Sequence, residues 1–291
     1  MKKKTILIGL AMLGALVSYN KSVETQEQTS TEETVPVEEP QETIVVEYDV
    51  TKPETIAQNI VAASGGLEAL KALKDVSYTY TYDDLAKGAK DISEEKYIFE
   101  GELSMAKYTT HGVHVVPELE GDAIQKFDGE KACVIVNDEK LTDEKAIGTS
   151  HFLRKVNFFW LTMMFKMADP GISYEYLGNE EVNGTAYDKL KVTYDGAVTQ
   201  KEQNDGYILY VNPETKLVDQ FLFSLPAFGI NDIVLLMKVE YEEINGLQLP
   251  TTRKMHAPLP EGGHTPEPVL IQTSNNLSFN NGFTTEEFAI N

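Results

Sequence analysis

Cysteine is almost absent from this sequence. Its 291 residues include one cysteine, Cys133, so an intramolecular disulfide is excluded. Cys133 lies in the strand-like run 131–136, KACVIV. A cysteine in such a run is more often a small buried apolar residue than a reactive thiol. An oxidising compartment is therefore permitted, but the sequence carries no disulfide pattern that would indicate one.

Positive charge is also scarce. The chain has 25 Lys and Arg against 46 Asp and Glu, a formal net charge of −21. A surface this acidic repels phosphate backbones, so we expect no nucleic-acid binding and no attraction to anionic lipid head groups through charge alone. The only arginines are Arg154 and Arg253. Each fits either an anion-binding role or a surface ion pair, and the sequence does not decide between them.

Catalytic and metal-binding signatures are missing. The sequence contains no G-x-S-x-G, no H-E-x-x-H, no C-x-x-C and no G-x-G-x-x-G. His111 and His114 are the nearest approach to a metal pair, but residues three apart on a strand face opposite sides and no third ligand is evident. We therefore predict no metal, no cofactor and no catalytic residue. A hydrolase that uses His151 beside an acid remains a less favoured alternative.

Residues 1–22 have the features of a secretory signal peptide. Lys2, Lys3 and Lys4 precede an apolar run from Thr5 to Val17, which is short for a transmembrane helix. No cysteine stands just after this run, where Tyr19 is found instead, so attachment of a lipid to a thiol at that position is excluded. We predict secretion across the inner membrane to the periplasm or envelope, with an uncleaved membrane anchor as the alternative.

An acidic disordered linker is predicted for residues 23–52. The segment is rich in Glu, Thr and Gln, contains Pro36 and Pro40, and carries no Lys or Arg before Lys52. Low hydrophobicity and uniform charge keep such a segment extended. Pro53 followed by Glu54 suits the first turn of a helix, so the folded domain is predicted at 53–291.

A change of periodicity after two short helices predicts a large antiparallel sheet. Helical spacing over 53–63 and 67–73 gives way at Val76 to strict alternation with a tyrosine face. Strands are predicted at 76–82, 96–103, 105–110, 114–116, 123–127, 132–136, 173–178, 187–194, 206–211, 217–224, 234–244, 247–255 and 268–279. Asn-Gly pairs at 183–184, 245–246 and 281–282 favour hairpin turns. This spacing excludes a parallel α/β fold, which needs helices between the strands.

The most apolar segment of the predicted domain is 150–171. It contains Trp160, the only tryptophan, and places Phe152, Val156, Phe159 and Met163 at helical spacing. We predict a helix here, with 141–149 as a polar lead and 169–171, Asp-Pro-Gly, as its end. It either fills the concave face of the sheet as core or forms a wall or lid of an apolar cavity, because methionine adapts to ligands of variable shape.

Four stretches of the sequence resemble those of a known fold family. They are FDGEKA at 127–132, the aromatic helix with the following hairpin at 156–194, DGYILYVNPETKLVDQFLF at 205–223 and INGLQLPTTRKM at 244–255. In this order they resemble the LolA/LolB-like superfamily of bacterial envelope proteins, and more closely an uncharacterised family of secreted Bacteroidetes proteins related to it. The resemblance implies a half-barrel of antiparallel strands closed by helices, whose apolar concave face holds lipoprotein acyl chains in the carrier members.

The predicted fold is therefore mainly β (α+β), an antiparallel half-barrel sheet with N-terminal helices and a mid-chain aromatic helix as plug or lid. The leading hypothesis for function is non-catalytic binding of an apolar or lipid-like ligand in the cell envelope. The residues expected to line or guard that site are Phe158, Phe159, Trp160, Met163, Met164 and Phe165. The alternative is a structural or partner-binding envelope protein whose barrel has a solid core. The oligomeric state is not predicted.

Overall fold

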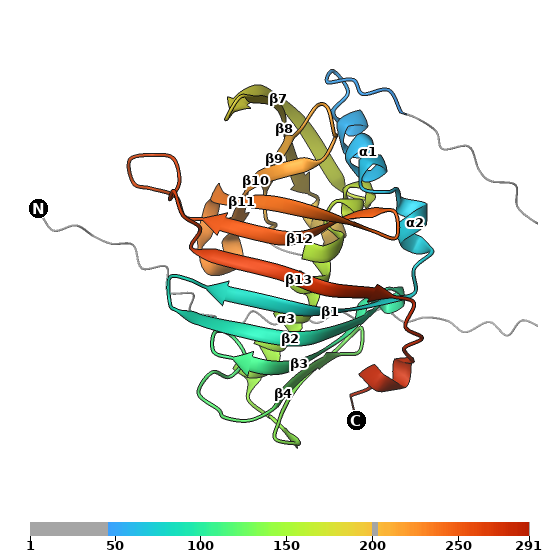
Figure 1. Ribbon diagram of the computed structural model, residues 1–291, viewed down its shortest axis with the longest axis vertical. Helices are drawn as coiled ribbons and strands as arrows, with labels where there is room; N and C mark the ends of the chain where they lie inside the picture. Colours follow the sequence, from blue (N-terminus) through green and yellow to red (C-terminus); the bar gives the residue numbers. More distant parts are fainter. Residues whose placement is uncertain (1–45, 200–202, 291) are drawn as a thin grey trace, which may run out of the picture.

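Alternating strands form one curved antiparallel sheet (Figure 1). The structure is a computed structural model that describes residues 46–199 and 203–290. The signal peptide predicted at 1–22 and most of the predicted linker lie outside these residues. Thirteen strands are hydrogen-bonded in the order β6-β5-β4-β3-β2-β1-β13-β12-β11-β10-β9-β8-β7, and every pairing between them is antiparallel. The predicted mainly β, antiparallel fold class is confirmed.

Most strands lie where the alternation predicts them. Their bounds are β1 Asp75–Asp84, β2 Ala89–Ile98, β3 Leu103–His111, β4 Ala123–Phe127, β5 Ala132–Val136, β6 Glu139–Lys140, β7 Ile172–Val182, β8 Thr185–Tyr194, β9 Tyr207–Val211, β10 Val218–Leu225, β11 Ile230–Ile244, β12 Leu247–His256 and β13 Leu270–Phe279. The turns at 183–184 and 245–246 have positive φ at both residues, as a type I′ hairpin requires. These two predicted hairpins are confirmed, whereas the pair at 281–282 follows the last described strand and joins no hairpin.

Two strand predictions on the N-terminal side are wrong. The strand predicted at 96–103 is instead β2, which begins at Ala89 and ends at Ile98. Its inward positions carry Asp91, Ser93 and Glu95, all buried, so the expected apolar alternation is absent from the sequence. No strand forms at 114–116, because the chain turns after β3 and the backbone N–H of His114 is bound by the Asp91 carboxylate at 3.0 Å.

The aromatic helix begins earlier than predicted. Helix α3 spans Glu144–Thr162, and Asp143 caps it by accepting a hydrogen bond from the Ala146 N–H at 2.7 Å. The segment expected to be a polar lead is therefore partly helical, because Asp is a strong N-cap and Glu144 suits the positive end of the helix. At its other end the chain tightens into a 3-10 turn, η2 Phe165–Ala168, before the predicted stop at Asp169.

Helix α3 joins the two edges of the sheet across one of its faces. It connects β6 to β7, contacts β3, β4, β5 and β12, and passes behind the central strands in Figure 1. Helices α1 Pro53–Ala63 and α2 Leu67–Lys71 confirm the predicted N-terminal helices, and both contact η2. The aromatic segment is therefore covered by strands on one side and by the N-terminal helices at its end.

Residues before α1 also contact the sheet. The Tyr48 hydroxyl donates to Asp188 Oδ2 at 2.7 Å, and the Lys216 Nζ lies 3.8 Å from the centre of the Tyr48 ring. The Asn59 side chain donates to the Val46 carbonyl at 3.1 Å. The end of the segment predicted as a linker is thus anchored beside β8.

Candidate ligand-binding site

Helix α3 buries a polar stripe against the sheet. Ser150, Arg154 and Asn157 follow one another at helical spacing, and they are 0%, 1% and 4% exposed. The Ser150 hydroxyl donates to the Cys133 carbonyl at 3.1 Å. An amphipathic helix ordinarily turns its polar side to water, whereas α3 buries this polar stripe together with Leu153 and Leu161 and exposes Lys145 and Lys155.

Arg154 attaches this stripe to the neighbouring strands. Its Nη2 donates to Glu95 Oε1 at 3.1 Å and to the Tyr108 hydroxyl at 3.0 Å, and its Nη1 donates to Glu95 Oε2. Its Nε donates to Gln125 Oε1 at 3.2 Å. The guanidinium therefore reaches β2, β3 and β4 through planar, paired hydrogen bonds of the kind that favour Arg over Lys.

The partner carboxylate is equally well satisfied. Glu95 also accepts from the Ser93 hydroxyl at 2.7 Å and from the Tyr97 hydroxyl at 2.8 Å. Burial opposes the charge of Arg154, yet the facing Glu95 carboxylate holds the pKa of the guanidinium well above its ordinary value. Arg154 and Glu95 form a buried, matched ion pair, and the surface ion pair considered for Arg154 is wrong.

Arg253 is buried without an acid. It is 2% exposed on β12, and it donates to Gln272 Oε1 at 3.0 Å, to the Pro250 carbonyl at 2.6 Å and to the Trp160 carbonyl at 3.5 Å. Within the described ranges no carboxylate forms an ion pair with it. Burial lowers the pKa of Arg253. A surface ion pair is wrong here too, while the anion-binding role considered for this residue stays open.

The other side of α3 carries an apolar stripe that is only half-buried. Phe152, Val156 and Phe159 recur at helical spacing. The Phe152 ring packs edge-on against Phe228 with ring centres 5.4 Å apart, and Phe159 lies 6.1 Å from Tyr207. Val156 contacts both the core cluster of β3–β5 and the cluster of β8–β11. This stripe, called the α3 apolar stripe below, therefore lies where the two halves of the core meet.

Three of the predicted lining residues form one wall behind this stripe. Trp160, Met163 and Met164 are 6%, 1% and 1% exposed and belong to the same core cluster. The Trp160 ring stacks on Phe221 and meets Phe223 edge-on, each at 5.8 Å between ring centres. Phe159 contacts the same indole at 5.5 Å. Aromatic rings thus pack closely around Trp160.

Phe158 and Phe165 lie elsewhere. Phe158 packs against Tyr97 and Phe99, each at 5.6 Å between ring centres. Phe165 joins Leu247 and Leu249 in a separate cluster. The structure therefore distributes the six predicted lining residues among three clusters, and their role in binding stays a prediction.

The histidines considered for chemistry have structural partners. The two ring nitrogens of His111 meet the Val115 and Gly121 carbonyls at 2.9 and 2.8 Å, and His114 Nδ1 lies 3.3 Å from Asp91. His151 packs on Phe127, and burial lowers its pKa. In the described part of the chain, no three His, Cys, Asp or Glu side chains are grouped to hold a metal ion.

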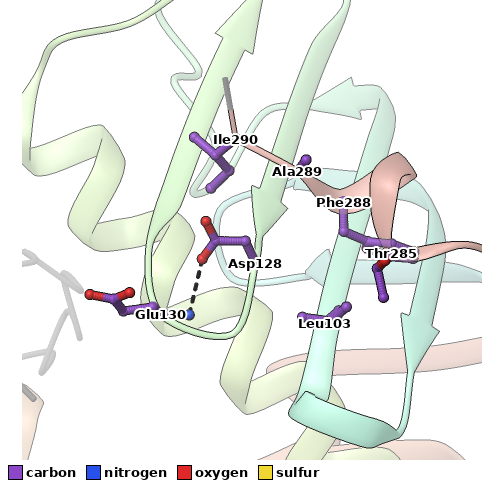
Figure 2. Close-up of a pocket in the computed structure, with 7 residues that line it drawn as sticks. All are labelled: Leu103, Asp128, Glu130, Thr285, Phe288, Ala289 and Ile290. Carbon is purple, nitrogen blue, oxygen red and sulfur yellow. Dashed lines mark hydrogen bonds between the residues drawn. The ribbon is translucent and has the colours of Figure 1, made fainter. Parts of the chain in front are cut away.

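A surface pocket has no α3 residue in its lining. It has a volume of about 530 Å³, and it is lined by Leu103, Asp128, Glu130, Thr285, Phe288, Ala289 and Ile290. Figure 2 shows it between the loop after β4 and the C-terminal turn, with Asp128 accepting the Glu130 N–H at 3.0 Å. None of the predicted lining residues contributes to it.

The polar partners of Arg154 were not recognised from the sequence. Glu95 and Tyr97 on β2, Tyr108 on β3 and Gln125 on β4 face α3. The sequence did contain a signal for Glu95. It lies two residues before Tyr97, so on a strand both side chains point to the same, buried side. A strand whose inward positions are polar resembles a loop until its partner, here Arg154, is known.

No helix among residues 46–199 and 203–290 combines the length and apolar character that crossing a membrane requires.

Comparison with known proteins gives a family match and partial structural likenesses. A model of a family of unknown function, DUF6503, matches residues 129–247. A search of curated proteins finds no match. A DUF1329 family protein from Desulfovibrio piger is similar with a TM-score of 0.47 and 12% identity, over 82% of this chain and 97% of that one.

Two further solved structures are similar at the same level. A putative outer membrane lipoprotein-sorting protein domain from Vibrio parahaemolyticus has a TM-score of 0.45 and 11% identity, over 82% of this chain and 97% of that one. A LolA superfamily protein from Nitrosomonas europaea has a TM-score of 0.45 and 14% identity, over 80% and 97%. The superfamily expected from the sequence is thus among the structures that this chain resembles.

Proposed function

We propose that this protein binds an apolar or lipid-like ligand in the bacterial cell envelope and catalyses no reaction. The observation that carries the proposal is the α3 apolar stripe, which is half-buried although α3 buries its polar stripe against the sheet. Phe152, Val156 and Phe159 pack only in part on the protein's own core, and their uncovered surface is available to another apolar surface.

The neighbours of this stripe suit a ligand of variable shape. Trp160, Met163 and Met164 lie directly behind Phe159, and methionine side chains repack at low cost. We propose these residues as the wall of the site, with Phe158 and Phe165 guarding it from their separate clusters. The apolar leader predicted at residues 5–17 supports the envelope as the compartment.

A second candidate is a structural or partner-binding envelope protein with a solid core. The close ring packing around Trp160 favours it, because Phe221 and Phe223 both meet the indole at 5.8 Å. In that case the α3 apolar stripe would be covered by a protein partner and not by a small ligand.

Native mass spectrometry of protein purified gently from its own cells separates the two candidates. We expect co-purifying acyl species that organic extraction releases and identifies. A mass that equals the bare chain, and stays so after incubation with lipids, contradicts ligand binding and favours the solid-core candidate.

The site is tested by Phe159→Asp, with Leu177→Asp as its matched control. Leu177 lies on the edge strand β7 and is 36% exposed, so the control adds the same charge at another partly exposed apolar position. Burying a Phe side chain is worth roughly 1.5–3 kcal/mol, so we expect Phe159→Asp to weaken lipid binding by about tenfold or more. Equal loss in both variants would contradict a site at the α3 apolar stripe.

A further inference from the structure

The two arginines of the chain are buried in opposite electrostatic settings. Arg154 faces the Glu95 carboxylate. Arg253 donates to a Gln272 side-chain oxygen and to the Pro250 and Trp160 carbonyls, all uncharged. One buried cation is therefore neutralised within the fold and the other is not.

The remaining groups around Arg253 do not supply a negative charge. The phenols that interact with it are Tyr78, Tyr80 and Tyr241. Burial raises the pKa of each of these tyrosines, so they stay neutral at physiological pH. A buried charge without a counter-charge is costly for the fold, and a guanidinium fork matches a carboxylate or phosphate group closely.

We propose that the ligand carries an acidic head group, carboxylate or phosphate, which pairs with the Arg253 guanidinium while its apolar tail lies along the α3 apolar stripe. This assignment rests on the proposed function and specifies its ligand as an anionic amphiphile. The chain's net charge of −21 gives no general attraction for such a molecule, so its recognition depends on this one buried cation.

In this arrangement the ligand's head group and apolar tail would lie on either side of Trp160. Arg253 reaches the backbone carbonyl of Trp160 at 3.5 Å, and the indole of Trp160 contacts Phe159 at 5.5 Å between ring centres. The Trp160 carbonyl lies farther from Arg253 than the Gln272 oxygen and the Pro250 carbonyl do. It is therefore the acceptor that an incoming head group would replace, with a shift of the C-terminal end of α3.

Titration monitored by Trp160 fluorescence tests the proposal on the full chain. The probes are dodecanoate, its methyl ester and dodecyl phosphate, at about pH 7, where the carboxyl group is ionised. We expect dodecanoate to bind at least about tenfold more tightly than the ester, which has the same tail without the charge. The tighter of the two anionic probes identifies the head chemistry.

Arg253→Gln should reduce the preference for the acid over the ester to about twofold or less, while ester binding stays unchanged. The control is Lys166→Gln, which removes a half-buried cation whose Nζ lies 5.5 Å from the Phe158 ring centre and which should keep the preference. Arg253→Lys keeps the positive charge but lacks the paired N–H donors of the guanidinium, so it should lose part of the preference for the acid over the ester. Circular dichroism checks the fold of each variant.

The outcomes separate this proposal from the proposed function. Equal binding of acid and ester by the wild-type protein overturns the head-group assignment and leaves apolar binding intact. Binding of none of the three probes overturns both. An undiminished preference in Arg253→Gln overturns Arg253 as the recognising group. If Arg253→Gln does not fold, an undiminished preference in Arg253→Lys overturns it instead.

Discussion

Glu95 shows how much of this fold depends on single buried charges. It is 1% exposed and accepts hydrogen bonds from Arg154, Tyr97 and Ser93. Because these donors come from α3 and from β2 itself, the carboxylate joins the helix to the sheet. A buried pair of this kind adds little net stability over an apolar pair of the same shape, but breaking it strands a charge.

We therefore expect Glu95→Gln to lower the free energy of unfolding by about 3–5 kcal/mol, because Arg154 would be left buried without its counter-charge. Urea unfolding followed by circular dichroism measures the loss. Glu94→Gln is the control, because Glu94 directly precedes Glu95 on β2 and its side chain is exposed. A loss below about 1 kcal/mol, the range of surface ion pairs, would contradict a buried pair.

The roles of the two arginines illustrate the limit of sequence reasoning at this scale. Nothing near Arg253 in the sequence indicates that it reaches Trp160, which is 93 positions away. Whether a polar side chain is inward or outward depends on the register between strands and on α3. The sequence therefore raised the anion-binding role of Arg253 without being able to favour it.

At the scale of elements, the turn between α1 and α2 fits closely against the hairpin of β11 and β12. The Gln248 N–H donates to the Ser64 carbonyl at 3.0 Å. A Cβ on Gly65 would lie 2.6 Å from the Gly246 carbonyl oxygen, whereas one on Gly66 would meet nothing within 4 Å. Both glycines have positive φ, at 112° and 85°.

This contact predicts different costs for two neighbouring substitutions. Gly66→Ala should cost only the backbone strain of a conformation that residues with a Cβ rarely adopt, φ 85° and ψ 151°, about 1–3 kcal/mol. Gly65→Ala should cost about 1–3 kcal/mol more, because the added methyl group collides with the hairpin backbone. Urea midpoints of the two variants measure the difference. Equal midpoints would contradict the packing of this turn on the hairpin.

Most elements were predictable because their patterns are local. Asn245-Gly246 specifies a hairpin, and Val76, Tyr78 and Tyr80 specify the inward face of β1. The start of α3 at Glu144 was missed although Asp143 is a strong N-cap residue, since the following segment has few apolar residues to mark a helix. β2 was misplaced because its inward face is polar, and only the position of Arg154 explains that.

At the scale of the whole molecule, α3 connects the two halves of the sheet. It contacts β3, β4 and β5 on one side and β12 on the other. Trp160 lies in the core cluster of β8–β11, while the start of α3 packs in the cluster of β3–β5. Because α3 contributes residues to both clusters, removing it would expose the apolar core of each half of the sheet.

We therefore expect unfolding in urea to give coincident transitions for Trp160 fluorescence and for far-ultraviolet circular dichroism, as a cooperative unit requires. Trp160 reports the core next to α3, and circular dichroism reports the whole sheet. A fluorescence transition at clearly lower urea would show that the end of α3 detaches while the sheet remains folded.

The first strand of the sheet, β1, pairs with the last one in the sequence, β13. Tyr80 lies opposite Ser274, so the strand that completes the middle of the sheet is made last during synthesis. Until residues 270–279 arrive, β1 has one unpaired edge and must be protected from pairing with other chains. Joining segments so distant in sequence is slow. The strand at the centre of the finished sheet is thus the last one that the ribosome supplies.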